Sequence, residues 1–230
     1  MSALVFEEVG FRHRGQALLE AIDLRLDASA RTMILGPNGA GKTLLLRIAH
    51  GLLQPTHGRS YWLGHAPRQA MVFQRPVMLR RSVLANIVYA LKVAGAPRDE
   101  RVPRALAALE QFDLAHLAGR AARVLSGGEQ QRLALARCWA LEPGVVFLDE
   151  PTASLDPASA LAIETAIGQF HRIGVKIVMT THDLGQARRL ADDVVFLHGG
   201  RLQEHTPAGE FFARPATEPA RRFTAGELVA

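Results

Sequence analysis

The chain has 230 residues, 48% of them hydrophobic, and its 27 Lys and Arg exceed its 22 Asp and Glu by a formal net charge of +5. This length predicts one sizeable core, alone or with a lobe attached. The single cysteine, Cys138, excludes a disulfide framework within the chain and suits a reducing compartment and burial as a small apolar residue. The basic excess is typical of a solvated surface, and composition alone does not separate this from contact with an anionic membrane or nucleic acid.

The first part of the chain predicts strands around a glycine-rich loop. Alternating patterns at residues 4–11 and 21–27 indicate strands of an antiparallel edge sheet. The apolar stretch 31–35 reads as a strand that enters the loop, residues 42–52 read as a helix, and residues 69–74 read as another strand.

Helical patterns dominate from about residue 82 to 141, which predicts a helical lobe inserted into an α/β core. Apolar strands return at 144–150 and 174–182, separated by a helical stretch, and such an order indicates a parallel sheet that is covered on both faces. Residues 192–205 read as a closing hairpin around a Gly-Gly turn. A short helix is expected after Pro207.

The segment GPNGAGKT at residues 36–43 fits the phosphate-binding pattern G-x-x-x-x-G-K-[ST]. Its glycines let the backbone curl so that N–H groups converge on phosphate oxygens, and the following helix adds its positive end. Lys42 is expected to reach the β- and γ-phosphates, and the Thr43 hydroxyl is expected to bind Mg²⁺. A glycine-rich turn with a chance lysine is the alternative, which the preceding strand and following helix disfavour.

Two acidic residues follow a second buried strand. In VVFLDEP, residues 145–151, the strand places Asp149 at its carboxyl end, where ligands bind in open parallel sheets. We expect Asp149 to hold Mg²⁺, through water, and Glu150 to orient or deprotonate the attacking water. Adjacent acids on a surface are the ordinary alternative.

The stretch LSGGEQQR at residues 125–132 predicts a second anion site. Gly127 and Gly128 expose backbone N–H groups at the start of a helix expected to begin near Glu129, and Ser126 adds a hydroxyl. In isolation the same letters also suit an ordinary loop and helix cap.

With these motifs in this order, nearly the whole chain resembles the ATP-binding subunits of ABC transporters. The resemblance implies one domain, residues 1–230, with a P-loop NTPase (RecA-like) core at about 1–75 and 142–230, an antiparallel β edge subdomain, and a helical lobe at about 76–141. It further implies a head-to-tail homodimer that sandwiches two ATP molecules, in which Ser126 and Gly128 of one subunit reach the γ-phosphate held by the P-loop of the other.

The resemblance assigns three further elements. Gln74 corresponds to the glutamine that touches Mg²⁺ or water and links core to lobe, and His182 corresponds to the histidine that contacts the γ-phosphate. The dimer-crossing loop is Ser154, Leu155 and Asp156, and the signature residues are Ser126, Gly127, Gly128 and Glu129. The expected nucleotide-binding residues are Gly36, Pro37, Asn38, Gly39, Ala40, Gly41, Lys42, Thr43, Leu44 and His13. The other histidines are expected at the surface or in turns, without metal-ligand spacing: His50, His57, His65, His116, His171, His198 and His205.

Two positions depart from the family pattern. His13 stands where an aromatic ring usually stacks on adenine, with Phe11 a less suitable substitute, so we expect weaker adenine contact and poor discrimination between ATP and GTP. Leu44 stands where Ser or Thr usually donates to the α-phosphate. Its backbone N–H still donates, and the lost side-chain bond costs on the order of 1.5–3 kcal/mol at most.

The resemblance also implies a membrane partner. The N-terminus lacks the pattern of a signal peptide, and the apolar run 83–91 is too short to cross a bilayer, so a membrane role requires permease subunits, with the chain at the cytoplasmic face. Residues 75–87, with apolar Val77, Met78 and Leu79 between arginines, suit a groove for a permease helix. The alternative is that these residues pack the lobe onto the core, and the same stretch can serve both roles.

The cargo rests on resemblance alone. Residues 47–53 and 73–87 are most similar to ATPases of bacterial tungstate-type oxyanion importers, which take tungstate or molybdate from a periplasmic or lipid-anchored binding protein; phosphate and amino-acid importers are alternatives. A soluble ABC ATPase acting on DNA or the ribosome is a second class, but the chain shows no tandem cassette or long insertion, and we expect no nucleic-acid partner. A regulator without turnover is disfavoured by Glu150 and His182.

Overall fold

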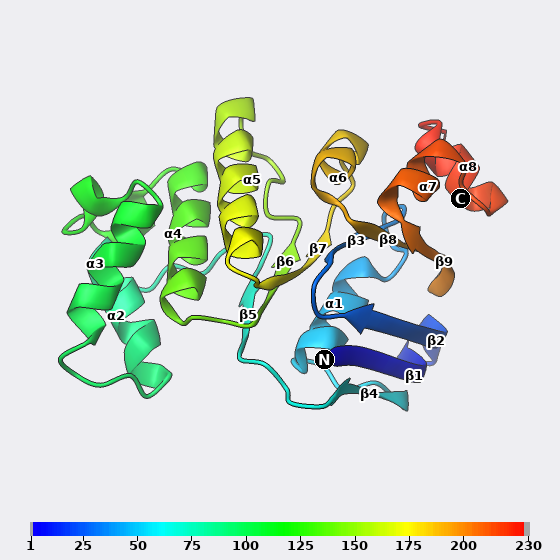
Figure 1. Cartoon of the computed structure of the whole chain (residues 1–230), viewed down its shortest axis with the longest axis horizontal. Helices are drawn as coiled ribbons and strands as arrows, with labels where there is room; N and C mark the ends of the chain where they lie inside the picture. Colours follow the sequence, from blue (N-terminus) through cyan, green and yellow to red (C-terminus); the bar gives the residue numbers. More distant parts are fainter. Residues whose placement is uncertain (1, 228–230) are drawn as a thin grey trace.

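The computed structural model describes residues 2–227 and contains two sheets with helices around them (Figure 1). The larger sheet has the strand order β5-β6-β7-β3-β8-β9, with parallel pairing up to β8 and an antiparallel β8–β9 hairpin. Its strands are β3 (Arg31–Leu35), β5 (Gln69–Val72), β6 (Val145–Asp149), β7 (Lys176–Thr180), β8 (Asp193–His198) and β9 (Arg201–Pro207).

The central strands are buried along their whole length because both faces of the sheet are covered. Alternate side chains of β6 enter different cores: Val145 and Phe147 join one, Val146 and Leu148 the other. The first core includes α1 (Lys42–His50) and the smaller sheet, and the second includes α5 (Pro157–Arg172) and the helical lobe. The predicted parallel sheet, covered on both faces, is confirmed.

The smaller sheet is antiparallel, in the order β2-β1-β4, and lies beyond α1 (Figure 1). It consists of β1 (Ala3–His13), β2 (Gln16–Asp27) and β4 (His57–Leu63). The first two strands were predicted, although β2 begins five residues before the predicted start. Strand β4 was missed because its mixed sequence HGRSYWL is nowhere fully buried and shows no alternation of apolar and polar residues.

Three helices form the lobe at the far end of the molecule from the small sheet (Figure 1). They are α2 (Val83–Val93), α3 (Arg101–Gln111) and α4 (Gly127–Ala140), with two short 3₁₀ turns between α3 and α4. Helix α4 also packs against α5 and β5, so the lobe and the sheet share one continuous apolar core. The predicted α/β fold with an antiparallel edge sheet and a helical lobe is therefore confirmed.

The end of the described chain returns to the large sheet. Helix α6 (Leu184–Leu190) follows β7, and α7 (Ala208–Ala213) is the short helix predicted after Pro207. A further helix, α8 (Glu218–Thr224), packs the Phe223 ring 5.2 Å from that of Phe196 on β8. Within residues 2–227, no helix is long and apolar enough to span a membrane.

Candidate functional site

The glycine-rich loop connects β3 to α1 and surrounds a cavity of about 340 Å³. Gly36 has a φ of 148°, and a Cβ there would lie 2.2 Å from the Leu197 carbonyl oxygen, so only glycine fits. Gly41 caps α1 without a side-chain bond, which leaves the first N–H groups of the helix directed to a ligand. The cavity is lined by Leu18, Asn38, Gly39, Ala40, Gly41, Lys42, Thr43, Leu44 and Glu150.

Lys42 is buried and folded back over the loop. Its Nζ donates to the carbonyl oxygens of Gly36 at 2.8 Å and Pro37 at 3.0 Å. Burial lowers the pKa of the Lys42 ammonium, and the carboxylates of Glu150 and Asp149 act in the opposite direction. The loop therefore holds a desolvated cation beside the cavity, which suits an anionic ligand.

Asp149 lies at the carboxyl end of β6 and is 4% exposed. Its Oδ1 accepts hydrogen bonds from the hydroxyls of Thr43 and Thr180, both at 2.8 Å. The neighbouring ends of β6, β7 and the P-loop thus gather hard oxygen atoms of the kind that Mg²⁺ prefers. In the part of the chain that the structure describes, no three His, Cys, Asp or Glu side chains gather into a metal site, so a metal here would take further oxygens from its ligand and from water.

Two residues singled out from the sequence, Gln74 and His182, converge at Glu150. Its Oε2 accepts a hydrogen bond from Gln74 Nε2 at 3.4 Å and lies 3.2 Å from His182 Nδ1. The Glu150 N–H donates to the hydroxyl of Thr180 at 3.0 Å, which fixes the residue in a left-handed conformation with φ of 43°. Strand β5 ends at Val72, so Gln74 reaches Glu150 from the loop beyond the strand rather than from the strand end that we predicted.

The signature stretch is a capping box at the start of α4. The Oγ of Ser126 accepts from the Glu129 N–H at 3.3 Å, and Glu129 Oε2 accepts from the Ser126 N–H at 2.7 Å. This backbone bond lowers the pKa of Glu129. Because Ser126 provides the cap, the helix begins at Gly127, and the start predicted near Glu129 is wrong by about two residues.

The signature stretch and the loop 154–156 are neighbours within one chain. A Cβ on Gly128 would lie 2.5 Å from Ser159 Oγ, so this position requires glycine. Ser159 is itself held by Asp156, which caps α5 and accepts from the Ser159 hydroxyl at 2.6 Å. A Cβ on Gly127 would lie 3.7 Å from a methyl group of Leu155. The left-handed φ of Ser154, 63°, turns the chain at this point.

The structure does not bring every predicted site residue to the cavity. Among the described residues that line it, none comes from the signature stretch. His13 is exposed at the end of β1, paired with Gln16, and does not line the cavity. Phe11 packs against the apolar core of the small sheet. Leu18 of β2 lines the cavity and was missed, because the strand was predicted to start at residue 21.

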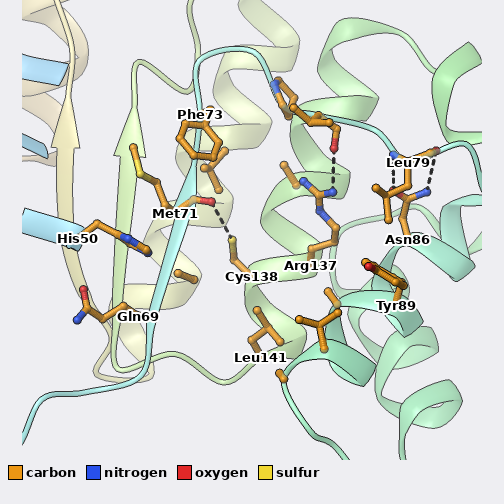
Figure 2. A pocket seen from close by; sticks show the side chains of 18 of the residues that line it. His50, Gln69, Met71, Phe73, Leu79, Asn86, Tyr89, Arg137, Cys138 and Leu141 are labelled. Carbon is orange, nitrogen blue, oxygen red and sulfur yellow. Dashed lines mark hydrogen bonds between the residues drawn. The ribbon is translucent and has the colours of Figure 1, made fainter. Parts of the chain in front are cut away.

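A second cavity, of about 520 Å³, lies between β5, α2 and α4 (Figure 2). In the predicted docking stretch, Val77 is 68% exposed at this cavity, Met78 is buried in the core, and Leu79 is half-buried. The stretch thus both packs the lobe and opens a groove. The Arg137 guanidinium crosses the groove to donate to the Val77 carbonyl oxygen at 2.9 Å, and Asn86 Oδ1 accepts from the Leu79 N–H at 3.0 Å.

Two residues in this groove bear on sequence predictions. Cys138 is buried, as expected, and burial raises the pKa of its thiol to about 12. His50 is not a surface or turn residue: it ends α1 and lines this groove (Figure 2). Its ring meets that of Phe147 edge-on at 5.5 Å, and burial lowers its pKa. The sequence signal was its place in the helical stretch 42–52, directly before Gly51.

The fold and the site define a P-loop ATPase, and comparison with known proteins identifies the family. Residues 19–153 match the model of the family described as ABC transporter. The chain is 39% identical to the tungstate uptake system ATP-binding protein of Peptoclostridium acidaminophilum, over 83% of this chain and 92% of that protein. The chain therefore belongs to the ABC transporter family, as an ATP-binding subunit that hydrolyses ATP.

Comparison with solved structures supports this family assignment. CbiO1 from Clostridium perfringens, described as part of an ABC transporter complex, superposes with a TM-score of 0.81 at 29% identity, over 92% of this chain and 90% of that chain. A dimeric ATP-binding cassette with bound ADP and phosphate superposes with a TM-score of 0.79 at 25% identity, over 89% and 98%. Other relatives, at 32–36% identity, are described as import proteins for phosphate, Fe³⁺, nickel and methionine.

Proposed function

We propose that this chain is the ATPase subunit of an importer, in which a head-to-tail homodimer couples ATP hydrolysis to a membrane permease. The observation that carries the proposal is the convergence of Gln74 and His182 on the Glu150 carboxylate beside the P-loop. A carboxylate that the metal does not need, and that neighbouring side chains orient, is placed to take the proton of an attacking water.

The other residues of the site bind and orient the nucleotide. Lys42 and the N–H groups of the P-loop hold the phosphates, because the loop offers a buried cation and a helix N-terminus. Thr43, Asp149 and Gln74 would hold Mg²⁺, since they offer hydroxyl, carboxylate and amide oxygens. When bound, the metal supplies charge neutralisation at the phosphate oxygens. In this proposal His182 contacts the γ-phosphate.

The dimer completes the site. Ser126, Gly127, Gly128 and Glu129 offer a helix N-terminus but do not line the P-loop cavity of their own chain. This supports a composite site, in which the signature of one subunit closes on the nucleotide of the other, with Ser154, Leu155 and Asp156 crossing the interface. A similar cassette whose solved structure is a dimer with bound ADP and phosphate supports the proposal of a dimer.

Mixing two inactive variants tests the composite site. Ser126→Ala leaves the P-loop intact, and Lys42→Ala leaves the signature intact, so each homodimer has two damaged sites. A mixed dimer has one site in which both halves are intact. We expect ATPase activity in the mixture to exceed that of either variant alone by at least severalfold. A mixture no more active than the better of the two variants would contradict a shared site.

The groove between core and lobe is the proposed docking site for a permease helix. Here the core comprises residues 1–75 and 142–230, and the lobe residues 76–141. The lining of the groove is mainly apolar, and Val77, Tyr89 and Val93 are exposed there. Residues 75–82 connect the groove to Gln74. Motion of a docked helix would therefore reach the Glu150 carboxylate through a short segment. The subunit would then sit peripherally at the cytoplasmic face of the membrane.

We further propose that the cargo is an oxyanion such as tungstate or molybdate, delivered by a periplasmic or lipid-anchored binding protein. The support is the 39% identity to a tungstate uptake ATPase. Phosphate and amino-acid import are the alternatives, because relatives described for phosphate and methionine import are 36% identical. ATPase activity of the reconstituted transporter, measured with tungstate-, phosphate- and methionine-loaded binding proteins, separates these cargoes by which one stimulates turnover.

A soluble ABC ATPase that acts on nucleic acid is the second candidate class. The net charge of +5 is the observation in its favour. A filter-binding assay tests it: tight binding to DNA or RNA that weakens steeply with salt would overturn the transporter assignment.

A further inference from the structure

A buried polar network outside the nucleotide cavity joins the loop after β6 to helix α6. Its centre is Gln186, which is 1% exposed. The Nε2 of Gln186 donates to Thr152 Oγ1 at 2.9 Å and to Glu164 Oε1 at 3.2 Å. The Glu164 carboxylate, on α5, also accepts two bonds from Arg189, at 3.0 Å and 2.7 Å. Each polar group is thus held by a partner, as a buried network requires.

Both ends of this network lie close to the hydrolysis site along the chain. Thr152 is two residues beyond Glu150. At the other end, the Gln186 N–H donates to Asp183 Oδ1 at 2.9 Å, and Asp183 directly follows His182. The Thr152–Gln186 bond therefore closes a ring that runs through the two side chains paired in the site, Glu150 and His182.

The segment that the network holds is conformationally strained. Glu150 and Ser154 have φ of 43° and 63°, in the left-handed region that side chains disfavour. Such conformations persist only where the surroundings hold them. The hydrogen bonds of Ala153 and Leu155 N–H stay within the loop, whereas the Thr152 hydroxyl reaches across to Gln186 on α6. That bond is placed to resist relaxation of the loop.

We propose that Gln186 is a positioning residue for ATP hydrolysis, which, through Thr152, fixes the Glu150 carboxylate against His182. This inference rests on the proposed role of Glu150 in orienting the attacking water. Gln186 does not line the nucleotide cavity and touches neither the P-loop nor the metal ligands in any described contact. Its loss is therefore expected to affect the rate of hydrolysis and not the binding of ATP.

Gln186→Leu tests the proposal, because leucine fills a similar volume without an amide. We expect kcat to fall by at least about tenfold, since a misplacement of 1 Å at a reacting group can cost about a hundredfold. KM and the dissociation constant of ATP should change by less than about threefold. Thr152→Val breaks the same bond from its other end and should give the same loss. The double variant should lose no more than the larger single loss, because both changes remove the same Thr152–Gln186 bond.

Thr165→Val is the matched control. Thr165 lies on the exposed side of α5, and its hydroxyl bonds only within its own helix in the described contacts, to the Leu161 carbonyl oxygen at 2.9 Å. The kcat of the Thr165→Val variant should equal that of the wild type. If Gln186→Leu fails to fold, Thr152→Val and its control carry the test. Wild-type kcat in both Gln186→Leu and Thr152→Val, even with lowered thermal stability, overturns the proposal, because the network would then only pack α6 against α5.

A parallel measurement of Glu150→Gln separates the inference from its premise. If Glu150→Gln loses turnover while Gln186→Leu and Thr152→Val keep it, the positioning role of Gln186 alone is overturned. If Glu150→Gln retains turnover, the role of Glu150 is wrong and the inference falls with it.

Discussion

The two ends of the large sheet both bury charge, with different results. At the carboxyl ends of β3, β6 and β7, Lys42 lines a cavity that is open to a ligand, and buried Asp149 accepts a hydrogen bond from Thr43 of the same lining. At the amino ends of β3, β7 and β8, Lys176 donates to Thr32 Oγ1 at 2.6 Å, and Asp193 lies 2.9 Å from His205 Nε2.

The partner of each lysine explains the difference. Lys42 bonds to backbone carbonyls of its own loop, so an incoming phosphate competes only with local bonds. Lys176, 3% exposed, bonds to a side chain of the neighbouring strand, so its site is closed by the sheet itself. Burial lowers the pKa of Lys176 to about 8, against the opposing effect of nearby Asp193, Asp27 and Asp192. One end of the sheet is therefore open to a ligand, and the other is closed within the fold.

The largest effect is expected from Glu150→Gln at the open end. The change removes the proposed base and keeps the size of the side chain, so ATP binding should persist while kcat falls by roughly a hundred- to ten-thousandfold. An ATP-bound dimer should accumulate, which size-exclusion chromatography with ATP detects. Glu110→Gln, on the exposed face of α3, is the control and should keep wild-type turnover. Wild-type turnover in Glu150→Gln would show that Glu150 is not the base.

Lys42→Ala should weaken ATP binding itself. Loss of a buried cation proposed to contact phosphate should raise the dissociation constant by about ten- to a hundredfold. Equilibrium binding of a fluorescent ATP analogue measures this. Lys92→Ala, in the exposed last turn of α2, is the matched control and should bind as the wild type does. Unchanged affinity in Lys42→Ala would exclude the predicted phosphate contact.

Lys176→Met tests the closed end through pH. The folded-state pKa of Lys176 is lowered from 10.5 to about 8, so between these values the unfolded chain binds a proton that the folded chain has lost. Stability from this group therefore rises as the pH increases from about 8 to 10.5. In urea unfolding, the free energy of unfolding of the wild type should rise relative to that of the variant across this range, by on the order of 3 kcal/mol at most. A difference that does not change with pH would contradict the lowered pKa.

The smallest effect is expected from Leu44→Thr. Leu44 lines the cavity and also packs against the core of the small sheet, so the added hydroxyl replaces a partly buried methyl group. ATP should bind no more weakly, and at most about fivefold more tightly, or about 1 kcal/mol. This is less than the full value of a hydrogen bond to a charged group, because the apolar packing of Leu44 is lost in the exchange. Titration calorimetry measures this. Weaker binding would show that the apolar contact of Leu44 matters more than a donor to phosphate.

Sequence patterns were most reliable where one local rule dominates. The buried strand that carries Asp149 and the P-loop follow from apolar runs and glycine spacing. The predictions failed where tertiary contacts decide the outcome. Strand β4 lacks alternation because it is an edge strand, Leu18 reaches the cavity only because β2 folds back beside the P-loop, and His50 is half-buried because α1 packs on Phe147.

The sequence by itself determined the family, the P-loop, the order of the motifs and the residue types of the site, because each of these depends on local spacing. Only the tertiary structure decided that Gln74 and His182 meet at Glu150, and that Gln186 ties the loop after Glu150 to the helix after His182. These residues are far apart in the sequence and belong to separate strands, loops and helices, so their distances are set by how the parallel sheet aligns its carboxyl ends.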